Sequence, residues 1–171
     1  MKTMIALAIE NKKQFMRCLL TAGVFDGFWI TEATLRTNVT YSIDTHLTKG
    51  FYSSEDLESL QLTEGDPMPF SMLRPTLYEL IRGTHTPIYF QFVLMLPPDM
   101  TANLLAESDT ALTGADISGL LLNQTCQNGA LRAPSAVSYR SFRPDHSVDR
   151  IWDQTVRQLL TKNGIIFEEI G

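Results

Sequence analysis

Cysteine is scarce in this chain of 171 residues, and that scarcity excludes several classes of protein. Cys18 and Cys126 are the only two, and they lack the CxxC spacing of a metal cluster or a redox pair. The three histidines are scattered and form no HExxH motif, so we expect no metal site. We interpret both cysteines as reduced, half-buried thiols of a cytoplasmic protein, because thiols stay reduced in that compartment.

The common catalytic and nucleotide-binding motifs are missing as well. The chain contains no G-x-S-x-G nucleophile elbow, no G-x-G-x-x-G loop and no G-x-x-x-x-G-K-[ST] loop. We therefore expect no cofactor, and the missing motifs count against an enzyme.

Long hydrophobic runs and an excess of positive charge are also absent. The apolar stretch Ile88–Leu96 is too short to span a bilayer, and Met4–Ile9 is shorter than the roughly 7–15 residues of a signal-peptide core. The formal net charge is −5, a sign that does not attract polyanions over long range. The composition predicts no membrane partner and disfavours nucleic acid, which leaves a protein partner or self-association.

The most apolar segment that is present is Ile88–Leu96, which lies between Thr86-Pro87 and Pro97-Pro98. One face would carry Ile88, Phe90, Phe92, Leu94 and Leu96, and the other Tyr89, Val93 and Met95. Two apolar faces are typical of a strand that is covered on both sides. We therefore expect this segment to be a core strand with both faces buried.

Periodicity and turn residues place the other elements along the chain. Strands are predicted at Met4–Ile9, 28–36, 38–47, 120–126 and 131–142, and helices after Asn11, at 55–60, from near Pro75, from Pro98 and at 148–160. Asn11 and Gln14 are predicted to cap the first helix, and Ser53 or Ser54 the short helix at 55–60, and 61–69 is the best linker candidate. Asn128-Gly129 favours a type I′ hairpin turn, and Pro134 predicts an edge strand or a bulge.

These elements predict an α+β fold in which helices pack on antiparallel sheet. Their order reads β-α-β-β-(α)-α and then β-α-β-β-α-(β). We therefore expect one domain over residues 1–171, with an internal duplication of a β-α-β-β-α unit at about 4–82 and 88–163. The order resembles the β-α-β-β units of DNA sliding clamps, although a shared fold does not assign a function.

Several short motifs stand out as a set. They are Met4-Ile5-Ala6-Leu7-Ala8-Ile9-Glu10, Ile43-Asp44-Thr45-His46 followed by Phe51-Tyr52, the pairs Arg74-Pro75 and Thr86-Pro87, and Trp152. Together they resemble a family of short bacterial proteins known only as a domain of unknown function. The resemblance covers nearly the whole chain and implies a bacterial cytoplasmic protein of one domain. It implies no substrate and no catalytic residues.

Asp44 and His46 are the first candidate catalytic residues, because they lie two apart on the polar face of a predicted strand. Their side chains would project together, roughly 7 Å apart along the strand. A carboxylate that orients an imidazole is the arrangement of a general base. His146 would join them only if the fold brings the two halves together. The alternatives are a solvated sheet face and a helix cap by Asp145 or Ser147.

Positive charge is unevenly distributed along the chain. No lysine or arginine occurs between Gly83 and Leu131, and five arginines then follow: Arg132, Arg140, Arg143, Arg150 and Arg157. Arg132 and Arg140 are predicted to share a strand face, and Arg150 and Arg157 a helix face. If those faces meet, the guanidinium groups would form an anion site. The alternative is ordinary surface pairing, such as Asp153 with Arg157 at i,i+4.

Several bulky apolar residues lie in predicted loops or at the ends of predicted elements, where they could bear on function. They are Phe25, Phe28, Phe51, Tyr52, Met68, Phe70 and Met72, and they either close over the core or form a partner surface. Because catalytic motifs are missing, we expect a non-catalytic binding or assembly module of unknown partner. The alternative is a small cofactor-independent enzyme that uses an Asp-His pair as general base.

Overall fold

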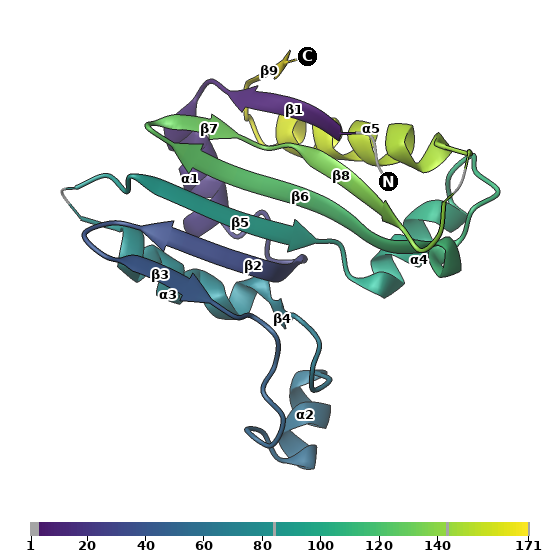
Figure 1. Ribbon diagram of the computed structural model, residues 1–171, viewed down its shortest axis with the longest axis horizontal. Coiled ribbons are helices and arrows are strands. Elements are labelled where there is room, and N and C mark those ends of the chain that lie inside the picture. The colour runs from purple at the N-terminus through teal and green to yellow at the C-terminus, as the bar shows by residue number, and fades with distance from the viewer. Residues whose placement is uncertain (1–3, 84, 143, 171) are drawn as a thin grey trace.

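The computed structural model describes residues 4–83, 85–142 and 144–170, and within them it forms five α-helices and one nine-stranded antiparallel sheet (Figure 1). The predicted α+β fold class is therefore confirmed. The helices are α1 (Lys12–Leu20), α2 (Ser54–Leu60), α3 (Phe70–Ile81), α4 (Pro98–Ala106) and α5 (Ser147–Lys162). The strands are β1 (Met4–Ile9), β2 (Trp29–Arg36), β3 (Thr40–Ile43), β4 (Met68–Pro69), β5 (Tyr89–Met95), β6 (Ile117–Gln127), β7 (Ala130–Arg132), β8 (Ser135–Tyr139) and β9 (Phe167–Ile170).

The strand order across the sheet is β3-β2-β5-β6, followed by β7 and β8 and then by β1. β4 pairs with β2, and β9 pairs with β1. The long strand β6 pairs first with β7 and then with β8. Pro134 lies between β7 and β8, where the carbonyl of Pro134 accepts a hydrogen bond from the Asn123 N–H at 2.9 Å. Of the two alternatives expected at Pro134, the edge strand is wrong, because β7 and β8 lie between β6 and β1, and Pro134 instead marks the break between β7 and β8.

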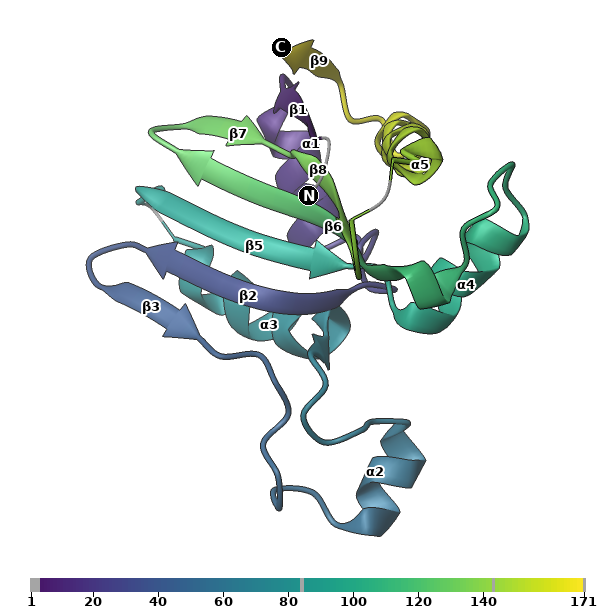
Figure 2. The same cartoon turned by 45° about the vertical axis from the view of Figure 1, so that its right-hand side comes forward.

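The core lies on one face of the sheet, because helices pack on that face. Helices α1, α3 and α5 cover it, as the two views in Figures 1 and 2 agree. The core between them contains Phe15 and Leu19 from α1, Leu77 from α3, and Trp152 and Val156 from α5. Burial of such large apolar side chains is the main contribution to the stability of a domain of this size.

Strand β5 shows the consequence of one-sided packing. Phe90, Phe92 and Leu94 are fully buried, whereas Tyr89 and Val93 on the opposite face are half-buried. The expectation that both faces are covered is therefore wrong, because the helices pack on one face only. On the open face Gln91 donates a hydrogen bond from Nε2 to Asn123 Oδ1 at 3.2 Å.

The first helix begins where expected, but its predicted capping pair is wrong. The side chain of Asn11 makes no cap and instead binds the loop before β9: its Nδ2 donates to the Gly164 carbonyl, and its Oδ1 accepts from the Ile166 N–H, both at 2.8 Å. Gln14 Nε2 donates to the Asn163 carbonyl at 2.9 Å. These two polar side chains therefore fasten the C-terminal segment to α1.

Helix α3 begins at Phe70, five residues before the predicted start at Pro75. A proline inside a helix lacks the N–H that bonds to the carbonyl four residues earlier, which destabilises the helix. The first turn is nevertheless held by tertiary contacts, because Phe70 and Leu73 are buried and the Arg74 guanidinium forms a two-bonded ion pair with Asp26. Packing therefore outweighs the local cost of the proline.

The hairpin between β6 and β7 has the expected turn: Asn128 and Gly129 both have positive φ, 52° and 80°. Asparagine and glycine adopt such angles at little cost. The duplication of a unit over 4–82 and 88–163 stays a prediction. Among the helices described, none is long and apolar enough to cross a membrane.

Candidate functional site

The most conspicuous surface feature is a lobe, residues 44–67, which joins β3 to β4 and projects away from the sheet with α2 (Figures 1 and 2). Its two chain segments pair at the neck. The Met68 N–H donates to the Thr45 carbonyl at 2.9 Å, and Leu47 exchanges hydrogen bonds with Asp66 and Gly65 at 2.8 and 3.0 Å. The predicted linker 61–69 is therefore wrong, because this segment forms the returning half of the neck.

Local hydrogen bonds order the lobe. The Ser53 hydroxyl accepts a hydrogen bond from the Asp56 N–H at 3.1 Å and caps α2, as the serine pattern predicted. A carboxylate oxygen of Glu64 accepts from the Gly50 N–H at 2.6 Å, across the lobe. The helix contains no buried residue, so the lobe is a folded projection that adds nothing to the main core.

An aromatic pair lies at the base of α2. The rings of Phe51 and Tyr52 meet edge to face, with centroids 4.9 Å apart. Phe51 is 75% exposed, whereas Phe25, Phe28 and Phe70 are buried in the core. Of the aromatic residues predicted either to close over the core or to form a partner surface, Phe25, Phe28 and Phe70 therefore do the former, and Phe51 is left on the surface.

Charge is concentrated in the lobe. It contains six carboxylates and one lysine, which gives a formal charge of −5. The whole chain has the same net charge, so the remainder of the protein is formally neutral. The acidic residues are Asp44, Glu55, Asp56, Glu58, Glu64 and Asp66, and the lysine is Lys49.

Asp44 and His46 lie at the neck of this lobe and contact each other. Asp44 Oδ1 lies 3.0 Å from His46 Nδ1 and accepts the His46 backbone N–H at 3.1 Å. The hydrogen bond from the backbone N–H, followed by that to the ring, holds the pKa of the Asp44 carboxyl below its ordinary value. Both side chains are exposed, so this contact is solvated.

A hollow of about 280 Å³ lies beside this pair and is lined by Asp44, Thr45, His46, Phe51 and Tyr52, among others. Thr45 is the buried member, only 2% exposed. Within the described part of the chain, its hydroxyl has no hydrogen-bond partner. A buried hydroxyl without a partner costs about 1–3 kcal/mol, a cost that a bound water or a ligand would offset.

His146 lies elsewhere, at the start of α5, and is not among the residues that line that hollow. Its Nδ1 is 3.1 Å from Asp149 Oδ2, and the Tyr139 hydroxyl donates to Asp149 Oδ1 at 2.8 Å. Burial, and then the Asp149 carboxylate, raises the pKa of Tyr139. Asp149 is 3% exposed. This second Asp-His pair has the buried carboxylate that the first lacks.

Sequence reasoning missed the role of Asp149, although it follows His146 by three residues at the start of the predicted helix 148–160, and that spacing was a usable signal. The turn before α5 is instead closed by Asp145, whose Oδ1 accepts the Ser147 N–H at 2.9 Å. That hydrogen bond lowers the pKa of the Asp145 carboxyl. Tyr139 had no local signal, because it reaches Asp149 from another element.

The five arginines come from several elements. Arg132 lies on β7, Arg140 directly after β8, and Arg150 and Arg157 on α5, while Arg143 lies outside the described residues. The Arg157 guanidinium is already bound to both carboxylate oxygens of Glu169, at 2.8 and 3.0 Å.

The surface pairing expected for Arg157 is therefore made, but with Glu169 of β9 rather than with Asp153. Asp153 is buried and accepts a hydrogen bond from the Ser135 hydroxyl at 2.5 Å. Burial raises the pKa of this carboxyl. The anion site stays a prediction, and Arg157 is already engaged by Glu169.

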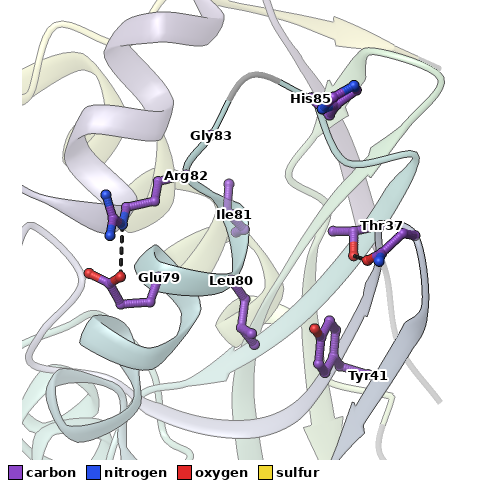
Figure 3. A pocket seen from close by; sticks show the side chains of 9 residues that line it. Thr37, Tyr41, Glu79, Leu80, Ile81, Arg82, Gly83 and His85 are labelled. Carbon is purple, nitrogen blue, oxygen red and sulfur yellow. Dashed lines mark hydrogen bonds and ion pairs between the residues drawn. The ribbon is translucent and has the colours of Figure 1, made fainter.

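A larger pocket, of about 610 Å³, lies between the β2–β3 turn and the end of α3 (Figure 3). Thr37 and Tyr41 line one side, Leu80 the other, and His85 lies on the loop beyond α3. Its arginine, Arg82, is paired with Glu79 at 2.7 Å, so this wall offers an anionic ligand no net charge. No cluster of three or more metal-binding side chains occurs within 4–83, 85–142 and 144–170.

Comparison with known proteins gives one result. A family model described as "Family of unknown function (DUF5721)" matches residues 18–168, which is most of the chain. No curated protein and no solved structure matches the sequence significantly.

Proposed function

Because the chain belongs to this family of unknown function, as its motifs indicated, we propose a function from geometry alone: a non-catalytic binding module whose lobe, residues 44–67, engages another protein. The observation that supports this most directly is the exposure of Phe51 on a folded, acidic projection. Exposed aromatic residues are enriched at protein interfaces and often supply much of the binding energy.

The construction of the lobe supports the same proposal. Its helix buries nothing, yet the neck ladder, the Ser53 cap and the Glu64 contact keep it ordered. Ordering a segment costs conformational entropy that burial within the fold does not offset here. A surface ordered before it meets a partner loses less entropy on binding, which favours affinity.

We also infer that the protein acts in a bacterial cytoplasm. Cys18 and Cys126 are both free and buried, and burial raises the pKa of each thiol. Buried thiols of raised pKa are chemically inert and suit a reducing compartment.

The test is site-specific cross-linking in bacterial cells. A photoreactive amino acid replaces Phe51 in one variant and Phe142 in the control. Phe142 is at least as accessible, at 85% exposure against 75% for Phe51, but it lies after β8, outside the lobe. We expect a discrete cross-linked protein from position 51 that position 142 does not give. That protein, once purified, should bind the wild type and bind Phe51→Ala at least roughly tenfold more weakly. Equal patterns from both positions would refute the proposal.

A second candidate is the cofactor-independent enzyme, and one observation favours it. The buried Asp149 carboxylate holds His146 and receives the Tyr139 hydroxyl, the orientation that a general base needs. The reaction would then use His146 rather than the solvated Asp44–His46 pair. A screen of simple esters and amides should reveal an activity that His146→Gln and Asp149→Asn each reduce roughly a hundredfold. Activity unaffected by either variant would exclude this pair.

A further inference from the structure

We propose that the lobe recognises a basic protein segment, and that the hollow beside Asp44 receives one lysine or arginine side chain of that segment. This inference rests on the proposed function and narrows the partner from any protein to a positively charged one.

The distribution of charge selects such a partner. The lobe carries a formal charge of −5 and the remainder of the chain is formally neutral, so the negative potential is centred on the lobe. Opposite charge on a partner speeds encounter and orients it, whereas an acidic partner would be repelled.

The hollow has the dimensions of a side-chain pocket. Its volume of about 280 Å³ lies just below the range of roughly 300–1,000 Å³ typical of small-molecule sites. One wall is the edge-to-face pair of Phe51 and Tyr52, whose ring faces attract cations. Another is Asp44, whose two contacts with His46 both use Oδ1 and leave Oδ2 without a bond to His46.

Thr45 supplies an observation independent of charge. It lines the same hollow, is 2% exposed, and its hydroxyl has no hydrogen-bond partner among the residues described. The oxygen itself has almost no exposed surface, so an ammonium or guanidinium group would reach it only once the Thr45 side chain turned toward the hollow. The hollow is lined by one carboxylate residue and two aromatic residues, a set that complements a cationic side chain.

The experiment measures binding of defined peptides to the full chain by fluorescence anisotropy. The probes are a fluorescein-labelled Gly-Ser peptide with three arginines, its lysine counterpart and its glutamate counterpart. We expect the two basic peptides to bind, more weakly as salt is added, and to shift the amide NMR signals of residues 44–52.

Two variants and a matched control locate the site. Asp44→Asn and Phe51→Ala should each weaken binding roughly three- to thirtyfold, because they remove the carboxylate and one ring. Asp109→Asn removes the same charge from an exposed position outside the lobe and should change affinity less than about twofold. Asp44 and Phe51 are exposed, so unchanged thermal unfolding should show that all three variants fold.

The contrary outcomes are distinct. Equal weakening by Asp109→Asn and Asp44→Asn would mean general charge attraction without a pocket, and would overturn the inference. A dimer that Asp44→Asn dissociates would make the occupant a second copy of this chain, which also overturns it. If no basic peptide binds while position 51 still cross-links one protein in cells, the inference fails and the proposed function stands. If neither occurs, both fail.

Discussion

Gln124 offers the sharpest test of how the core is built. It lies on the central strand β6, opposite Phe92, and its side chain faces the helices at 0% exposure. Neither Oε1 nor Nε2 has a hydrogen-bond partner among the described residues. A primary amide buried in this way gives up its hydrogen bonds to water on folding and recovers none of them.

Replacing Gln124 by methionine should therefore stabilise the protein. Methionine has a similar length and flexibility, so the replacement keeps the packing while removing two unpaired polar atoms. The gain in the free energy of unfolding should be about 1–3 kcal/mol, the cost of an unsatisfied buried polar group. For a chain of this length that corresponds to a rise of roughly 3–10 °C in Tm.

Urea unfolding monitored by circular dichroism measures the effect, with the midpoint expected to rise at an unchanged slope. Gln91→Met is the matched control, because the Gln91 amide is half-buried, donates to Asn123 and accepts from the Tyr89 hydroxyl at 3.2 Å. The control should be neutral or destabilising by up to about 1 kcal/mol. A destabilised Gln124→Met with an unchanged slope would refute the reasoning and indicate that the amide is hydrogen-bonded in solution.

Two further substitutions probe polar contacts between distant segments. Arg74→Met should lower the free energy of unfolding, measured by urea titration, by about 1–2 kcal/mol. The substitution removes two hydrogen bonds to Asp26 and a third to the Leu20 carbonyl at a partly exposed site. An unchanged free energy of unfolding would mean that the ion pair does not contribute to stability. Asp153→Asn should stabilise at pH 7, since burial raises the pKa of this carboxyl and disfavours its charged form, while the amide oxygen still accepts from Ser135. As the pH falls from the raised pKa toward the ordinary 3.8, the free energy of unfolding of the wild type should rise toward that of Asp153→Asn, because the folded carboxyl is then neutral. A difference between the two proteins that grows on acidification would contradict the assignment.

The candidate site was only partly predictable from the sequence. Asp44 and His46 were recognisable by their spacing of two, but the predicted strand 38–47 is too long: β3 ends at Ile43, and the two residues touch in the segment that follows it, where Asp44 Oδ1 contacts both the backbone N–H and the ring of His46. The His146–Asp149 pair was not identified, and its third member, Tyr139, belongs to another element. The Thr45 hydroxyl has no hydrogen-bond partner in the described part of the chain, and this was not predictable at all, because burial and pairing are properties of the assembled neck.

By itself, the sequence determined the features that depend on neighbouring residues. The strand Tyr89–Met95, the Asn128-Gly129 turn, the Ser53 cap and helix α5 follow from side-chain period and backbone preference, and the family follows from local motifs. These act over a few residues, so the order of the chain is enough to specify them.

Only the tertiary structure decided which faces are covered and which polar groups are paired. Gathering the helices on one face left half of β5 partly exposed, and contacts across roughly 150 residues drew Asn11 and Gln14 to the C-terminal segment instead of the helix end. The same packing carried α3 through Pro75 and buried the Gln124 amide with no hydrogen-bond partner among the residues described. Hydrophobic burial responds to the whole assembly, and its free energy outweighs a local cap or a single amide.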